Sequence, residues 1–188
     1  ELLWGDVKGS LDLIKEQAEV ILQEDKKLIS IGGDHLVTYP LIQATHRFYP
    51  NLAVIHFDAH TDLRESFLGA RLSHATVMRL VAEEVGPKSV AQIGIRSGEK
   101  EEFEWGRANT HFFADTHWDV VSASEKVVKI FKDRPIYITL DIDVLDPAYA
   151  PGTGTPEAGG CTSKELFQAL YIILENLNVI GADIVEIA

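Results

Sequence analysis

The sequence has 188 residues, 46% of them hydrophobic, and a formal net charge of -12; this suits one compact domain with a sizeable core over residues 1–188. The acidic balance, with no block of Lys or Arg, argues against a nucleic-acid-binding protein, and the single cysteine, Cys161, excludes an intrachain disulfide and a thiolate zinc site. No apolar run reaches the length of a membrane span and no signal-peptide pattern opens the sequence, so we expect a soluble, cytoplasmic protein without a membrane partner. Because the sequence starts at Glu1 and stops at Ala188 directly after a strand-like run, we also expect a fragment truncated at both ends.

Helix-type and strand-type patterns alternate along the chain. Residues 10–24 carry apolar residues at helical spacing, with Ser10 as the expected N-cap. Residues 52–58 begin with consecutive apolar residues, which is typical of a parallel strand covered on both faces. We further expect a capping box at Thr162 and Glu165, helices over 38–47, 73–84, 122–131 and 162–176, and strands over 27–31, 90–95, 110–114, 136–140 and 179–186. The alternation predicts an α/β fold in which a mainly parallel sheet is sandwiched between helices.

Polar side chains that could bind a metal follow several of these strands. Ligands of parallel α/β sheets bind beyond the carboxyl ends of the strands. In an extended chain alternate side chains point to one face, so each cluster of alternating residues should converge. The clusters are Gly32 to His35, Asp58 with His60 and Asp62, Asp141 with Asp143, and Glu186.

Four aspartates and two histidines are more ligands than one ion requires. They suit two divalent ions about 3.5 to 4 Å apart, which together generate a hydrolytic nucleophile from water, and oxygen-rich ligands with two imidazoles favour Mn²⁺. An EF-hand counted from Asp141 fails, because position six is Asp146 instead of Gly and position twelve is Gly152 instead of Glu. Any one cluster could instead hold a helix cap or a turn residue, and Asp34 is a good cap candidate.

Further polar residues could act on a substrate. His74 stands at a predicted helix start, where it could donate a proton to a leaving amine near neutral pH or simply form a local hydrogen bond. Glu186 ends an apolar strand, where its carboxylate could bind a planar guanidinium through paired hydrogen bonds or could be solvated at a frayed chain end. The other histidines are expected to be structural or solvated: His46, His56, His111 and His117.

Together these motifs resemble the ureohydrolase family of arginases and agmatinases. The matching segments follow the family's order from Gly32 to the end of the chain: GGDH at 32–35, DAHTD at 58–62, SH at 73–74, DIDVLDP at 141–147, PGTGTP at 151–156 and VE at 185–186. The resemblance implies the arginase-like three-layer α/β/α fold, two Mn²⁺ ions per chain that hydrolyse a guanidino group to urea, and a homo-oligomer, trimeric or hexameric.

The resemblance also assigns roles to individual residues. One ion would be held by His35, Asp58, Asp62 and Asp141, and the other by His60, Asp58, Asp141 and Asp143, with Asp58 and Asp141 bridging. His74 would be the proton shuttle. Glu186 would bind the guanidinium, and Thr155 would lie in the loop that helps to position it.

The residues that follow the DAHTD motif favour agmatine as the small cationic substrate. Arginases usually carry an Asn soon after this motif and an Asp directly after the equivalent of Arg96, and both hold the amino-acid head group. This sequence has Leu63, Arg64 and Ser97 there, and Ala75 where many agmatinases have Gly. We therefore expect hydrolysis of agmatine to putrescine and urea, a step of polyamine biosynthesis. An arginase or guanidinobutyrase-type ureohydrolase is the alternative, and a non-catalytic metal-dependent binding protein is the alternative of another class.

Overall fold

The computed structural model describes residues 5–114 and 119–188, whose strands form one sheet in the order β1-β6-β5-β2-β3-β4. Every neighbouring pair in this sheet is parallel. The strands are β1 (Leu28–Ile31), β2 (Ala53–Phe57), β3 (Val90–Ile93), β4 (His111–Phe113), β5 (Pro135–Asp141) and β6 (Asn178–Val185). The structure confirms the predicted α/β class and the parallel sheet.

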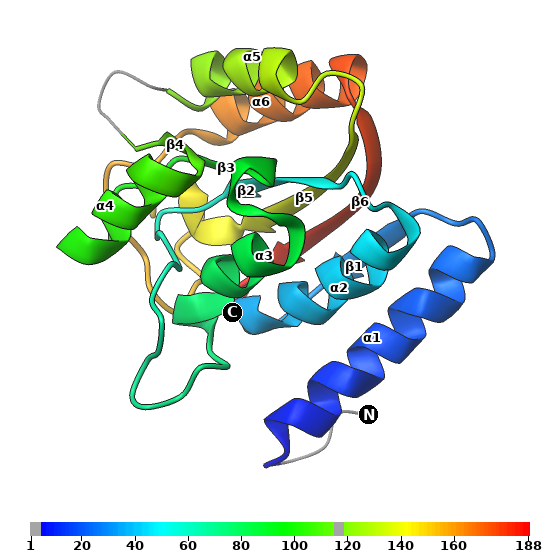
Figure 1. Cartoon of the computed structure of the whole chain (residues 1–188). Coiled ribbons are helices and arrows are strands. Elements are labelled where there is room, and N and C mark those ends of the chain that lie inside the picture. Colours follow the sequence, from blue (N-terminus) through cyan, green and yellow to red (C-terminus); the bar gives the residue numbers. More distant parts are fainter. Residues whose placement is uncertain (1–4, 115–118) are drawn as a thin grey trace.

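Helices cover both faces of the sheet. In Figure 1, α5 (Val120–Ile130) and α6 (Ser163–Asn176) lie on one side of the strands, and α2 (Thr38–Phe48) and α3 (Val77–Val85) lie on the other. The long helix α1 (Val7–Gln23) packs on α2 at the outside, and α4 (Lys100–Asn109) lies beside β4. Short 3-10 turns complete the fold: η1 (His35–Val37), η2 (His74–Thr76), η3 (Pro87–Ser89) and η4 (Ile142–Val144).

Two hydrophobic clusters hold the three layers together. One joins α5 and α6 to the sheet, and the other joins α1, α2 and α3 to its opposite face. All five residues of β2 are buried, because this strand lies inside the sheet with helices on both sides. Among the described residues, no helix combines the length and the apolar content needed to cross a membrane.

The structure corrects some of the predicted element boundaries. The first helix begins at Val7, not at Ser10, because the side chain of Asp6 accepts a hydrogen bond from the Gly9 amide at 2.8 Å and caps the helix. The helix predicted over 73–84 starts as the 3-10 turn η2 and becomes α-helical only at Val77. The capping box of Thr162 and Glu165 is confirmed.

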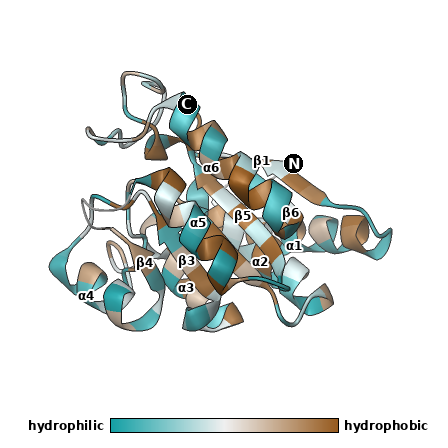
Figure 2. Cartoon of the chain, turned by 90° about the horizontal axis from the view of Figure 1, so that it is seen from above, coloured by the Kyte–Doolittle hydropathy of each residue, from teal (hydrophilic) through white to brown (hydrophobic). Residues whose placement is uncertain are grey.

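Helix α4 was not expected from the sequence. Figure 2 shows mostly hydrophilic colours along it, whereas α5 and α6 mix hydrophobic and hydrophilic residues. A helix with so few apolar residues gives almost no periodic signal. It is held locally instead, by a capping box between Glu99 and Glu102 and by the close approach of Gly106 to the ring of Phe112.

The strand order brings the polar motifs together. They follow β1, β2, β5 and β6, and these four strands are adjacent in the sheet as β1-β6-β5-β2. Since all of them are parallel, their carboxyl ends lie at the same edge. The candidate site is built there.

Candidate metal centre

The turn after β1 folds His35 back over the edge of the sheet. A Cβ atom on Gly32 would lie 2.8 Å from Val37 Cγ2, so only glycine allows the chain to turn this closely. Asp34 then caps η1 by accepting a hydrogen bond from the Leu36 amide at 2.9 Å, as its position after two glycines predicted. As a result His35 is 1% exposed, although it lies in a connection between a strand and a helix.

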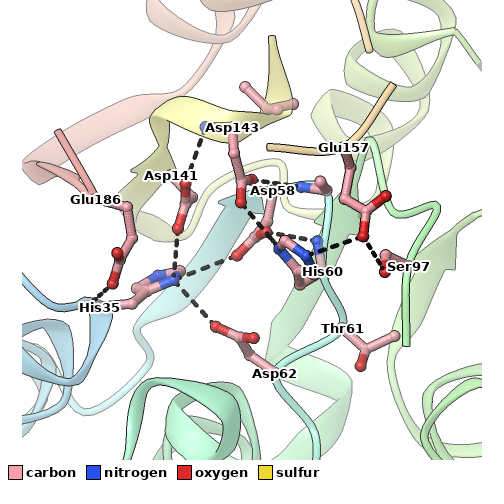
Figure 3. A network of polar contacts seen from close by, with 12 residues as sticks. His35, Asp58, His60, Thr61, Asp62, Ser97, Asp141, Asp143, Glu157 and Glu186 are labelled. Atoms are coloured by element: carbon pink, nitrogen blue, oxygen red, sulfur yellow. Dashed lines mark hydrogen bonds and ion pairs between the residues drawn. The ribbon is translucent and has the colours of Figure 1, made fainter. Parts of the chain in front are cut away.

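Three carboxylates converge on one nitrogen of the His35 ring. Its Nδ1 lies 3.1 Å from Asp62 Oδ2, 3.2 Å from Asp58 Oδ2 and 3.3 Å from Asp141 Oδ2 (Figure 3). This buried nitrogen has no hydrogen-bond partner of its own. Ligands about 2.1 Å from an ion and at right angles to each other lie about 3 Å apart. The spacing of this first cluster therefore fits a shared divalent ion.

A second cluster forms around His60. Its Nδ1 lies 2.9 Å from Asp143 Oδ2 and 3.5 Å from Asp58 Oδ1, and the buried Asp143 Oδ2 also has no hydrogen-bond partner. Asp58 thus belongs to both clusters and turns one oxygen to each. Asp141 differs from Asp58, because only its Oδ2 approaches a ligand cluster, at His35, while its Oδ1 accepts a hydrogen bond from the Asp143 amide at 2.9 Å. The bridging role expected of Asp141 therefore stays a prediction.

The ligands converge through turns, and the expected extended geometry of these motifs is wrong. Strand β2 ends at Phe57, and Asp62 has a left-handed backbone with a φ of 52°. Asp58 Oδ1 accepts the His60 amide at 2.6 Å, which bends the chain directly after the strand. Asp143 likewise lies in η4 and not in an extended segment. Local hydrogen bonds, not strand alternation, aim these side chains.

The charges of the site explain why it suits cations. Burial raises the pKa of Asp141 to about 8, and the charge of Asp58 adds to this effect, while the close contact with the His35 ring opposes it. Burial and the charge of Asp58 also raise the pKa of Asp62. Burial acts in the same direction on Asp58, but the adjacent His56, which also donates a hydrogen bond to it, and the contacts with the His35 and His60 rings bring its pKa well below the ordinary range. Divalent ions would neutralise this crowding of carboxylates.

A cavity of about 510 Å³ opens over the two clusters. His74 lines it with an exposed side chain, whose Nδ1 lies 3.3 Å from Asp34 Oδ2 and whose ring contacts the ring of Phe67 edge-on. Thr155 lines the same cavity and is exposed. The structure thus brings both predicted substrate-side residues to the ligand clusters.

Glu186 also lies at this cavity, directly after β6. Its Oε1 accepts the His35 amide at 2.7 Å, and its backbone adopts a left-handed φ of 59°. Burial raises the pKa of the Glu186 carboxyl, and the hydrogen bond from the His35 amide opposes that shift. Glu186 is therefore a held, half-buried residue, and the alternative of a frayed, solvated chain end does not apply.

Some side chains that the sequence analysis did not place at the site approach the metal-ligand side chains: His56, which was expected to be structural or solvated, and Glu157 are two of them. His56 is completely buried, and its Nε2 lies 2.7 Å from Asp58 Oδ2. The signal was present, because His56 stands two residues before Asp58 and alternate residues along a strand point to the same side. Glu157 accepts a hydrogen bond from the Ser97 hydroxyl at 2.8 Å, and its Oε1 lies 3.6 Å from His60 Nε2 (Figure 3).

Of the histidines that the structure describes, His46 and His111 make their contacts outside both clusters. His46 Nδ1 lies 3.0 Å from Glu84, and the His111 ring nitrogen Nε2 lies 3.2 Å from the Lys88 carbonyl oxygen. His117 lies outside the residues that the structure describes.

Comparison with known proteins finds relatives that match along the whole of this chain. The family model described as the arginase family matches residues 2–188. The agmatinase of Bacillus cereus is 50% identical and that of Bacillus subtilis 49% identical; each match covers all of this chain and 64% of the relative, so the chain spans less than two thirds of their length. Among solved structures, a proclavaminate amidino hydrolase from Streptomyces clavuligerus is 31% identical with a TM-score of 0.88, covering 100% of this chain and 64% of that one. An agmatine ureohydrolase of Thermoplasma volcanium is 29% identical with a TM-score of 0.83, covering 97% and 61%. By its sequence, its fold and the place of its polar motifs, the chain belongs to the arginase family.

Proposed function

We propose that the protein hydrolyses agmatine with water to putrescine and urea at a binuclear manganese centre. The observation that carries the proposal is the convergence of two imidazoles and four carboxylates, unpartnered at His35 Nδ1 and Asp143 Oδ2, beneath an open cavity. The similarity to curated agmatinases over the whole of this chain supports agmatine as the substrate.

The proposed ligands divide into two sets that share Asp58. His35, Asp62 and Asp141 would complete the first set, and His60 and Asp143 the second, with Asp141 as a further bridge. The oxygen-rich, two-imidazole donor set favours Mn²⁺ over structural zinc. When bound, a pair of divalent ions supplies a nucleophile from water at neutral pH and stabilises negative charge on the reacting group.

Glu186 is proposed to bind the guanidinium. Its Oε1 is held by the His35 amide, and its Oε2 faces Gly154 in the loop that carries Thr155. A carboxylate fixed in this way can accept two parallel N–H bonds from a planar guanidinium. Because burial raises the pKa of Glu186, a bound cation also offsets the cost of keeping this carboxylate charged.

His74 is proposed to protonate the departing amine. Asp34 Oδ2 lies 3.3 Å from His74 Nδ1 and orients the ring. This contact leaves Nε2 to carry the transferred proton. Such a positioned acid contributes a rate factor of about 10² to 10⁴.

The residues around the cavity also bear on the choice between agmatine and arginine. Leu63 is buried, Arg64 lies 3.0 Å from Glu99 in an ion pair, and Ser97 donates a hydrogen bond to Glu157. The positions where arginases hold an amino-acid head group are therefore occupied by contacts within the protein. Agmatine has no carboxylate that would have to be held at these positions.

The proposal is tested by urea release from a Mn-loaded, full-length preparation. Agmatine should give the highest kcat/KM, with arginine and guanidinobutyrate well below it. A higher kcat/KM for arginine or guanidinobutyrate would identify that compound as the substrate in place of agmatine. Mn²⁺ binding without urea release from any of the three compounds would favour the non-catalytic binding protein. The trimeric or hexameric state and the cytoplasmic location stay predictions, to be checked by sedimentation and fractionation.

A further inference from the structure

We propose that Gln92 and His56 form a buried positioning pair that sets the orientation of Asp58, the carboxylate common to both ligand clusters. The inference rests on the proposed metal centre, but its first step concerns only hydrogen bonds within the metal-free chain. Gln92 and His56 are direct cross-strand partners of β3 and β2, and neither is exposed.

The orientation of the Gln92 amide follows from a backbone carbonyl. Gln92 Nε2 lies 2.7 Å from the Thr61 carbonyl oxygen, which can only accept a hydrogen bond. The NH₂ end of the amide must therefore point to this oxygen, and the same nitrogen lies 3.1 Å from His56 Nδ1. In this orientation Gln92 Oε1 is buried without a hydrogen-bond partner. The side-chain amide thus makes two hydrogen bonds through its nitrogen and none through its oxygen.

This amide decides which nitrogen of the His56 ring carries the proton. Because Gln92 donates to Nδ1, the neutral ring must carry its hydrogen on Nε2. Nε2 lies 2.7 Å from Asp58 Oδ2 and donates to it. Gln92 and His56 thus form a chain of hydrogen bonds that runs from the Thr61 carbonyl to the Asp58 carboxylate.

The consequence is a carboxylate that is held at both oxygens. Asp58 Oδ2 accepts from His56, and Asp58 Oδ1 accepts the His60 amide at 2.6 Å. With these bonds in place, Oδ2 faces His35 Nδ1 at 3.2 Å and Oδ1 faces His60 Nδ1 at 3.5 Å. Losing the His56 donor would free one oxygen, so the carboxylate could rotate away from the geometry in which it serves both clusters.

Polar side chains behind metal ligands commonly orient those ligands and raise metal affinity. Their removal typically costs about 10-fold to 100-fold in affinity. His56 and Gln92 line neither the cavity nor a substrate path, so we assign them positioning roles and no contact with the substrate.

The first experiment records the ring-nitrogen NMR signals of His56 in the metal-free 188-residue chain. We expect the Nε2–H form in the parent, and in Gln92→Met a mixture of both ring forms with faster exchange of the ring proton. Val90→Ala is the matched control, since Val90 is equally buried on the same face of β3 and its truncation loosens the same region. An Nδ1–H ring in the parent, or a His56 signal that Gln92→Met leaves unchanged, would overturn the proposal.

The second experiment measures Mn²⁺ affinity by calorimetry in a matched pair of variants. His56→Leu keeps an apolar group of similar size but no donor, and should bind Mn²⁺ about 10-fold to 100-fold more weakly than the parent. His56→Gln can place an amide N–H near the original Nε2 and should stay within about threefold of the parent. Equal losses in the two variants, or parental affinity in His56→Leu, would show that His56 only fills space.

These two measurements separate the inference from the proposed function. A parent chain that binds no Mn²⁺ contradicts the metal centre, whereas the NMR signals still decide whether Gln92 sets the His56 ring. Circular dichroism of each variant and of Val90→Ala identifies losses that come from unfolding.

Discussion

Replacing Asp141 with Asn should change stability and metal binding in opposite directions. Burial raises the pKa of Asp141 to about 8 in the folded chain, with Asp58 adding to the shift, whereas an unfolded Asp titrates near its ordinary value of about 3.9. A folded-state pKa above the unfolded value means that folding takes up a proton. The resulting stability is present at low pH and is lost as the pH rises through about 8.

The magnitude follows from the size of the shift. A difference of about 4 pKa units at about 1.4 kcal/mol per unit gives an upper limit of about 6 kcal/mol for the cost of ionised Asp141 in the metal-free chain. Coupling of Asp141 to His35 and Asp58 reduces this cost. We therefore expect the free energy of unfolding of metal-free Asp141→Asn to exceed that of the parent by about 2 kcal/mol or more at pH 9. Asn Oδ1 can still accept the Asp143 amide, which Asp141 Oδ1 accepts at 2.9 Å.

The assay is urea unfolding with EDTA at pH 6 and pH 9, followed by the same series with Mn²⁺. The parent should lose stability between the two pH values without metal and regain it with Mn²⁺, because a ligand that binds only the folded state stabilises it. Asp141→Asn should show a flatter pH dependence and little response to Mn²⁺. Asp146→Asn is the control: Asp146 follows in the same loop, and amide hydrogen bonds from Ala148 and Gly159 lower its pKa. If metal-free Asp141→Asn were less stable than the parent at pH 9, the assignment of unfavourable charge to this site would be wrong.

Three further substitutions test separate parts of the structure. His74→Ala should lower kcat by about 10² to 10⁴ while Mn content by elemental analysis stays parental; loss of metal in this variant would contradict the proton-shuttle role. Glu186→Gln should lower kcat/KM for agmatine by about 10-fold to 100-fold through loss of a charge-assisted contact, and unchanged kinetics would remove Glu186 from the substrate site. Asp6→Ala should lower the free energy of unfolding by about 1 kcal/mol, with Asp6→Asn close to the parent because it keeps the capping acceptor; equal losses in both would contradict the cap.

Much of the fold could be predicted because its determinants are local. Consecutive apolar residues in β2 and helical spacing in α1 reflect burial within single elements, and the structure confirms these elements. Helix α4 was not predicted, because its sequence is mostly polar and only a few of its residues contact the rest of the protein. The Arg79 guanidinium lies 4.1 Å from the Trp105 ring, for example, which joins α3 to α4 through residues far apart in the chain.

The candidate metal-binding side chains, and their place after strand ends, could be read from the sequence because residue type and hydrophobic pattern are local properties. How these side chains meet could not, because strand order and backbone turns depend on contacts between distant segments. The order β1-β6-β5-β2 puts Asp58, Asp141, Glu186 and the turn before His35 at one edge. The His60 amide aims Asp58, where strand alternation was expected to do so. The contact between His56 and Gln92 depends on the tertiary structure, because it forms only where β3 lies beside β2.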